Sequence, residues 1–298
     1  MRRYAFTLIE LVFVIVIMGL LSKFGVEFLA RAYDSFIASS INNSLQSKSA
    51  SAVETIATRL QYRIKDSIIA RQPGVDFQAL ASSTLAENAT ILEWIGYDID
   101  GMRADSNPSW SGIIDLYHPS TTAATLFSPL TNTANIDSNI SALSGGGSGI
   151  NSSAIYFIGS NSDIQTGYGW SGAIVDHNNS TMHPINSTLV GTNIFASGIA
   201  GVNFSGADLY EYYQLAWSAY AVVHSNGNLT LHYDYQPWLG DTYLLKRDGT
   251  ATKSVLLMQN VDTFRFKAIG SIVKIQVCVN QTILAGKEYS LCKEKTIF

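Results

Sequence analysis

Cysteine and charged residues are both scarce in this chain of 298 residues. Two cysteines are too few for a disulfide-rich scaffold or a zinc ribbon. Only 14% of the residues are charged, which excludes a disordered acidic or basic tail protein. The net charge of −4 and the pI near 5.7 argue against a protein built to neutralise nucleic acid phosphates. The length allows one large domain or two small ones with a real hydrophobic core.

Motifs of common enzymes and metal sites are also absent from the sequence. It contains no P-loop, no Rossmann glycine pattern and no nucleophile elbow. The five histidines form neither an HExxH motif nor a close pair with a carboxylate at helical spacing. If residues 226–227 turn a hairpin, His224 faces Leu229 and His232 faces Ala221, so these histidines are not cross-strand partners. We therefore expect neither a zinc site nor an enzyme.

An apolar run near the start is the most distinctive part of the sequence. Residues 6–21 read FTLIELVFVIVIMGLL and follow the short basic leader MRRYA. Phe6 to Phe24 would make about 28 Å of helix, close to the hydrocarbon thickness of a bilayer. No Ala-x-Ala cleavage site follows the run, so a secretory signal peptide is not expected. Arg2 and Arg3 favour a cytoplasmic leader, which places the rest of the chain across the membrane.

Glu10 is the acidic residue inside this run. A carboxylate at the bilayer centre costs about 2.5–3.5 kcal/mol, so it usually has a partner. Two interpretations stay open at this point. In the first, Glu10 is an interfacial acid favoured by the positive end of the helix dipole. In the second, cleavage before Phe6 creates an α-ammonium group four residues upstream, and Glu10 pairs with it in its own chain or in a neighbouring one.

The sequence AFTLIEL from Ala5 to Leu11, followed by VFVIVIMGLL, resembles the prepilin cleavage and methylation signature of type IV pilins and type II secretion pseudopilins. The resemblance implies cleavage after Ala5 by a prepilin peptidase, N-methylation of Phe6 and a role for Glu10 in setting the register between adjacent subunits. The family usually has glycine where this chain has Ala5, and alanine is the next smallest residue, so we expect processing. The match is specific over about residues 1–30 and only architectural beyond them.

A long helix is predicted to continue from the apolar run. No proline occurs between residues 1 and 72, and Pro73-Gly74 is the expected stop. Apolar residues at helical spacing predict an amphipathic helix continuous with the span. We expect its outer half to pack on the following domain. The apolar stripe consists of Tyr33, Ile37, Ile41, Leu45, Val53, Ile56, Leu60, Ile64 and Ile68.

From about residue 75 the pattern changes to short β-rich runs separated by Gly, Asn, Ser and Asp. Asn226-Gly227 and Ile269-Gly270 are expected to turn hairpins. The glycine-rich stretch Thr131–Ser153 is expected to be a loop. The predicted strands are Thr90–Tyr97, Gly112–Tyr117, Ala154–Gly159, Leu215–Val223, Asn228–Tyr235, Thr242–Lys246, Val261–Ala268 and Ser271–Val279.

The expected fold class is therefore α+β and pilin-like, with a long N-terminal transmembrane helix that continues into an amphipathic helix packed on an antiparallel β-sheet domain. The expected divisions are a leader (1–5), a transmembrane and assembly helix (6–28), an amphipathic extension (29–72) and a periplasmic globular domain (73–298). The large β region and the VDTFRF…IVKIQV ending look most like J-type minor pseudopilins or large minor pilins.

The resemblance implies a structural subunit of a type IV pilus or a type II secretion pseudopilus. Such a subunit waits in the inner membrane with its globular domain in the periplasm. The implied partners are a prepilin peptidase/methyltransferase, other pilins or pseudopilins and an inner membrane assembly platform. Two alternatives stay open: a single-span anchored periplasmic enzyme or ligand-binding protein, and a tip adhesin or DNA-uptake subunit. Nucleic acid is not the expected partner, although Arg265, Lys267 and Lys274 would share one strand face.

Cys278 lies in a predicted strand and Cys292 near the end of the chain. In an oxidising compartment we expect a disulfide between them, worth about 3 kcal/mol by loop closure, with two buried thiols as the alternative.

Asp98, Asp100 and Asp105 form the only candidate calcium loop. They lack the third early acidic ligand and the final glutamate of an EF-hand, and an Asp-Gly turn explains them equally. No cofactor is otherwise expected.

Charge is distributed unevenly along the chain. Residues 73–245 carry 14 acidic residues against the single base Arg103, whereas residues 246–298 carry 9 bases against 4 acids. One interpretation is a set of solvated loops on an acidic surface. The other is a pair of complementary patches that orient neighbouring subunits.

Overall fold

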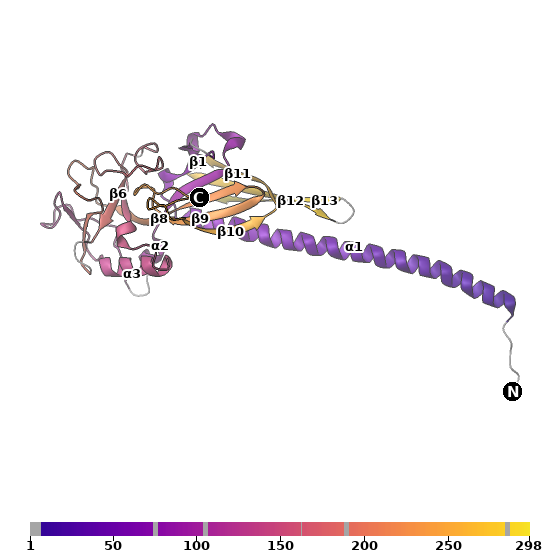
Figure 1. Ribbon diagram of the computed structural model, residues 1–298. Helices are drawn as coiled ribbons and strands as arrows, with labels where there is room; N and C mark the ends of the chain where they lie inside the picture. Colours follow the sequence, from indigo (N-terminus) through magenta and orange to yellow (C-terminus); the bar gives the residue numbers. More distant parts are fainter. Residues whose placement is uncertain (1–6, 74–76, 104–106, 162, 188–190, 284–286) are drawn as a thin grey trace.

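The computed structural model describes residues 7–73, 77–103, 107–161, 163–187, 191–283 and 287–298. A single long helix, α1, projects from a β-rich globular domain, and its free end lies far from that domain (Figure 1). Helix α1 spans Leu8–Gln61, which is 54 residues or about 80 Å of helix. The architecture is α+β, with antiparallel pairing between all of the described strands.

Helix α1 ends at Gln61, so the predicted continuation of the helix to residue 72 is wrong. The apolar spacing does continue through Ile64 and Ile68, but these residues flank the short 3-10 helix η1 (Lys65–Ser67) and lie outside α1. The Ile64 N–H donates to the carbonyl of Ile95 at 2.8 Å, and strand β1 (Ile69–Arg71) follows. Isoleucine packs well on a pleated surface, so pairing with a neighbouring strand decides the conformation here rather than local spacing.

The first sheet is a ten-stranded antiparallel layer with the order β2-β1-β3-β8-β5-β6-β7-β4, and β9 and β10 extend from β8. The long strand β8 (Tyr213–Ser225) pairs with β3, β5 and β9 and so joins the two ends of the domain. The other strands are β2 (Phe77–Ala79), β3 (Ile91–Tyr97), β4 (Thr125–Phe127), β5 (Ala154–Phe157), β6 (Met182–Asn186), β7 (Ile194–Ser197), β9 (Asn228–Tyr235) and β10 (Lys253–Gln259).

The second sheet contains β11 (Val261–Ile269), β12 (Ile272–Ile283) and β13 (Lys287–Ile297) in that order. Both predicted hairpins are confirmed. Strands β8 and β9 turn at Asn226-Gly227, where both residues have positive φ. Strands β11 and β12 turn at Gly270-Ser271, one residue later than the predicted Ile269-Gly270. His224 pairs with Leu229 and His232 with Ala221, as the two-residue turn predicts.

Three of the predicted local structures are wrong. Gly112–Tyr117 and Thr242–Lys246 form only isolated bridges, at Ile113 and Leu245. The expected loop at residues 131–153 contains helix α3 (Thr133–Leu143), whose N-cap Asn132 accepts hydrogen bonds from two backbone N–H groups. Serine, asparagine and glycine dominate that stretch, so the sequence analysis overlooked two of its isoleucines, Ile136 and Ile140, which are buried one helical turn apart.

The remaining short elements connect the strands. Seven of the observed strands were not predicted, namely β1, β2, β4, β6, β7, β10 and β13. Charged residues dominate β13 and hide its β pattern. The connecting elements are η1 (Lys65–Ser67), η2 (Leu80–Ser82), η3 (Ala86–Asn88), α2 (Ile99–Met102) and η4 (Ile150–Ser152).

The C-terminal part of α1 lies against both sheets and shares a hydrophobic core with them. Ile56 and Leu60 are fully buried in one cluster with Trp94 of the first sheet and Val277 of the second. Burial of a large aliphatic side chain contributes about 1.5–3 kcal/mol. This core therefore fixes the helix to the globular domain, as the sequence predicted for the outer half of the helix.

Candidate functional site

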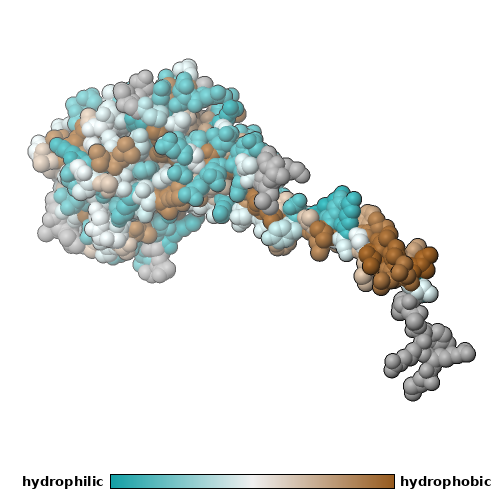
Figure 2. Space-filling view, turned by 45° about the vertical axis from the view of Figure 1, so that its right-hand side comes forward, coloured by the Kyte–Doolittle hydropathy of each residue, from teal (hydrophilic) through white to brown (hydrophobic). Residues whose placement is uncertain are grey.

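The free part of α1 exposes its apolar side chains. From Leu8 to Phe36, large hydrophobic residues are 42–81% exposed, and they cover the free end of the helix in Figure 2. We call residues 8–36 the apolar stem. By length and composition α1 can cross a membrane, since its most apolar window has a mean hydropathy of 2.2. A contiguous exposed apolar surface of this size marks a site that lipid or another protein covers.

Glu10 lies in the first turn of this stem. The backbone N–H and the hydroxyl of Thr7, the N-cap residue, donate to the same Glu10 carboxylate oxygen, at 2.9 and 2.8 Å. An acid at this place also faces the positive end of the helix dipole, which agrees with the first interpretation of Glu10. Ala5 and Phe6 lie outside the described residues, so cleavage, methylation and pairing with a Phe6 ammonium stay predictions.

Polar contacts hold the part of α1 that follows the apolar stem against the second sheet. Tyr289 donates from its hydroxyl to Asn42 at 2.7 Å, and Lys295 pairs with Glu54 at 2.6 Å. Just past the helix, the buried guanidinium of Arg63 donates to the carbonyls of Leu60, Ser271 and Phe298. These contacts join the last turn of α1 to the β11–β12 turn and to the final residue, so the stem leaves the domain in a fixed direction.

The structure describes two of the three carboxylates of the candidate calcium loop. Asp98 is buried as the N-cap of α2, where it accepts hydrogen bonds from the Gly101 N–H and the Trp110 indole N–H. Burial raises its pKa to about 6. Asp100 points to solvent, and Asp105 lies outside the described residues. Among the residues that the structure describes, no group of three or more His, Cys, Asp or Glu side chains could hold a metal ion.

The predicted disulfide is confirmed. Cys278 on β12 and Cys292 on β13 are bonded and occupy directly opposite positions in the antiparallel ladder. Their Cα atoms lie 4.0 Å apart, as in the closely spaced, non-hydrogen-bonded type of pair. The bond therefore fastens the last strand, which contacts α1, to the centre of its sheet.

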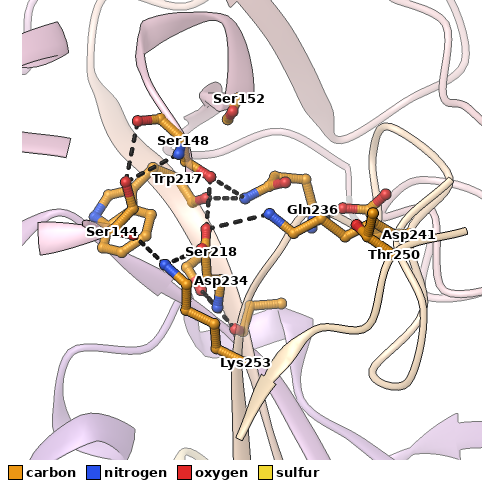
Figure 3. Close-up of polar contacts among 12 residues, drawn as sticks. Ser144, Ser148, Ser152, Trp217, Ser218, Asp234, Gln236, Asp241, Thr250 and Lys253 are labelled. Atoms are coloured by element: carbon orange, nitrogen blue, oxygen red, sulfur yellow. Dashed lines mark hydrogen bonds and ion pairs between the residues drawn. The ribbon is translucent and has the colours of Figure 1, made fainter. Parts of the chain in front are cut away.

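A buried carboxylate, Asp234, is the centre of the polar cluster shown in Figure 3. It lies at the end of β9, has a φ of 60° and is fully buried. Ser148 donates to it at 2.5 Å, and the ammonium groups of Lys253 and Lys246 lie 2.9 and 3.5 Å from its oxygens. Lys253 also contacts the carbonyl of Ser144. Asp234 therefore ties β9 and β10 to the loop that follows α3.

A second buried carboxylate lies on the same sheet. Glu93 of β3 is 1% exposed, forms an ion pair with Arg71 of β1 and accepts a hydrogen bond from the Tyr235 hydroxyl at 3.0 Å. Burial raises the pKa of Glu93, while Arg71 and Tyr235 oppose that rise. Neither carboxylate was predicted to be part of a site, because a single acid in an apolar strand gives no signal of which distant base it meets.

His177 and His183 form a buried stacked pair with ring centres 5.6 Å apart. His177 shares a hydrogen bond of 2.8 Å with the Ser197 hydroxyl, and the Nδ1 atoms of both rings find no hydrogen-bond partner among the residues that the structure describes. Burial lowers their pKa values to about 4 and about 3, so both imidazoles are neutral at neutral pH.

The uneven charge of the sequence is partly neutralised inside the molecule. Lys246 and Lys253 pair with Asp234, Arg265 with Glu87 at 2.6 Å, and Lys295 with Glu54. Bases of the C-terminal segment thus meet acids from earlier parts of the chain. For the charged residues that stay on the surface, the structure favours neither solvated acidic loops nor complementary patches between subunits.

Comparison of this chain with protein-family models, with curated proteins and with solved structures gives no match.

Proposed function

We propose that this protein is a minor pilin or pseudopilin, a structural, non-enzymatic subunit of a type IV pilus or a type II secretion pseudopilus. Before assembly it would stay in the inner membrane, with the globular domain in the periplasm. The apolar stem is the observation that carries the proposal, because its exposed hydrophobic side chains need a cover. Lipid supplies that cover before assembly, and the stems of sister subunits supply it in the filament.

Glu10 would set the register of this packing. Among the described residues its carboxylate is bonded to Thr7, and we propose that it takes a second partner in the filament. After cleavage, the α-ammonium of Phe6 in an adjacent stem would be that partner. An unpaired charge in a dry helix core costs about 3–5 kcal/mol, which penalises every wrong register.

Glu10→Gln and Glu27→Gln form a matched pair of variants that test this function. Each removes one negative charge from α1, but Glu27 lies beyond the apolar run and is bonded to Arg31 at 2.6 Å. We expect both variants to insert in the membrane. Incorporation of Glu10→Gln into filaments should fall more than a hundredfold, as expected from a loss of about 3 kcal/mol, and Glu27→Gln should resemble the wild type.

Mass spectrometry of the native N-terminus separates this proposal from a membrane-anchored enzyme or ligand-binding protein. A mature chain that begins at methylated Phe6 supports the filament subunit. A chain that keeps Met1 and never leaves the bilayer for a polymer contradicts it. Equal incorporation of the two variants would leave the filament function but remove the role of Glu10 in register.

A further inference from the structure

We propose that the free edge of strand β11 accepts an extended segment of a partner polypeptide as an additional antiparallel strand. Within the proposed function the partner is a sister subunit, but the binding geometry does not depend on that identification. Strand β11 is an edge of the second sheet, since within the described segments it pairs only with β12. An unpaired edge offers a row of backbone donors and acceptors to another chain.

The hairpin register identifies the groups that are free. The two-residue turn makes Ile269–Ile272 a hydrogen-bonded pair, so the backbone groups of Phe264, Phe266 and Ala268 point away from β12. Within the described part of the chain, no backbone hydrogen bond joins these three residues to another segment on that side. Three residues with free N–H and C=O groups are enough to begin a ladder with an incoming strand.

A groove runs along this same edge. It has a volume of about 680 Å³, the six consecutive residues from Asp262 to Lys267 all line it, and it continues over β12 to Glu294 of β13. Leu80 and Ala89 form part of the opposite wall. The volume is in the range of ligand-binding clefts.

The β13 edge of the same sheet is protected in a way that the β11 edge is not. Lys293, Glu294 and Lys295 place charges of both signs along β13, which is a common defence of an exposed edge. Along the β11 groove the half-buried side chain of Phe266 offers an apolar contact instead. The ion pair of Arg265 with Glu87 crosses from β11 to η3, and because both side chains are more than half exposed, it opens at little cost.

Charge gives the incoming strand a direction. Arg265 pairs with Glu87 and Lys274 with Glu294, so among the described residues Asp262 and Lys267 are the charges of the groove without an ion-pair partner. They lie at opposite ends of the strand edge. An antiparallel partner therefore carries an acid near its N-terminal end, opposite Lys267, and a base four residues later, opposite Thr263 and next to Asp262, with small or β-branched residues between them.

Hydrogen exchange on the full-length protein in detergent, resolved at single amides, tests the proposal without any filament. In the free protein, the amides of Phe264 and Phe266 should exchange quickly while those of Arg265 and Lys267 are protected. The peptide TEVTVKT should slow exchange at Phe264 and Phe266 at least about tenfold. The peptide TKVTVET has the same composition with the charges exchanged, and it should bind about tenfold more weakly.

Two variants with the same charge change complete the test. Lys267→Glu should weaken binding of TEVTVKT, whereas Lys293→Glu, away from the groove, should not. Free-state protection of Phe264 and Phe266, no protection with either peptide at millimolar concentration, or equal affinity for both peptides would overturn the proposal. None of these outcomes bears on N-terminal processing or filament incorporation, so a failure here is distinct from a failure of the proposed function.

Discussion

Substitution of Asp234 by asparagine isolates the contribution of its buried charge. The amide has the shape of the carboxylate, and asparagine tolerates the positive φ of this position, so backbone strain stays the same. What the variant removes is the negative charge that faces Lys253 at 2.9 Å and Lys246 at 3.5 Å. The perturbation is therefore electrostatic, at a site with no solvent exposure for the carboxylate.

The expected loss of stability follows from the exposure of the partners. Breaking a buried ion pair costs about 3–5 kcal/mol, because one charge stays buried without compensation. The side chains of Lys253 and Lys246 are 39% and 18% exposed, so their ammonium groups can turn partly toward water. We therefore expect the lower end, about 3 kcal/mol, which lowers the Tm of a domain of this size by about 6–12 °C.

Thermal unfolding of the full-length protein in detergent measures this effect. Lys253→Met should destabilise by a similar amount, and the double variant by less than the sum, because both changes remove the same interaction. Asp248→Asn, at an exposed acid nearby, is the control and should stay within about 0.5 kcal/mol of the wild type. A decrease in Tm below about 2 °C for Asp234→Asn, or strict additivity in the double variant, would refute the reasoning.

Two further predictions concern the disulfide and the buried histidines. Replacement of Cys278 and Cys292 by serine should lower the free energy of unfolding by about 3 kcal/mol through loss of loop closure, measured by urea unfolding. If chemical reduction of the disulfide left the urea midpoint of unfolding unchanged, the prediction would be wrong. The pKa values of His177 and His183 are depressed in the folded state, so only the unfolded state gains protons as pH falls below about 6.5. Stability should therefore decrease toward pH 4 by about 1.4 kcal/mol per pH unit for each imidazole, and His183→Phe should reduce that slope. An unchanged slope in this variant would show that other groups control acid unfolding.

Local signals account for the correct predictions. The Asn226-Gly227 pair fixes a two-residue turn, and the turn fixes the register of β8 against β9, including the positions of His224 and His232. The disulfide could be predicted because the two cysteines lie only 14 residues apart in the sequence. The apolar stem could be predicted as well, since a long uninterrupted apolar run has few alternatives to an exposed or membrane helix.

The errors arise where distant parts of the chain compete with local preference. The spacing of Ile64 and Ile68 fits a helix, but the Ile64 N–H bonds to Ile95 of β3 and residues 69–71 pair with β3 as strand β1, so the helix does not continue. Buried Ile136 and Ile140 give α3 its packing in a stretch whose composition indicates a loop. The partner that a buried carboxylate such as Asp234 finds also depends on tertiary contacts.

By itself, the sequence determined the apolar stem, the two-residue turns and the separation into one helix and a β region, because each depends on residues that are close in the chain. Only the tertiary structure decided where α1 ends, which bases meet Asp234 and which strand edge stays open. These features depend on residues that are far apart in sequence, and their energies come from burial and pairing that no local pattern contains.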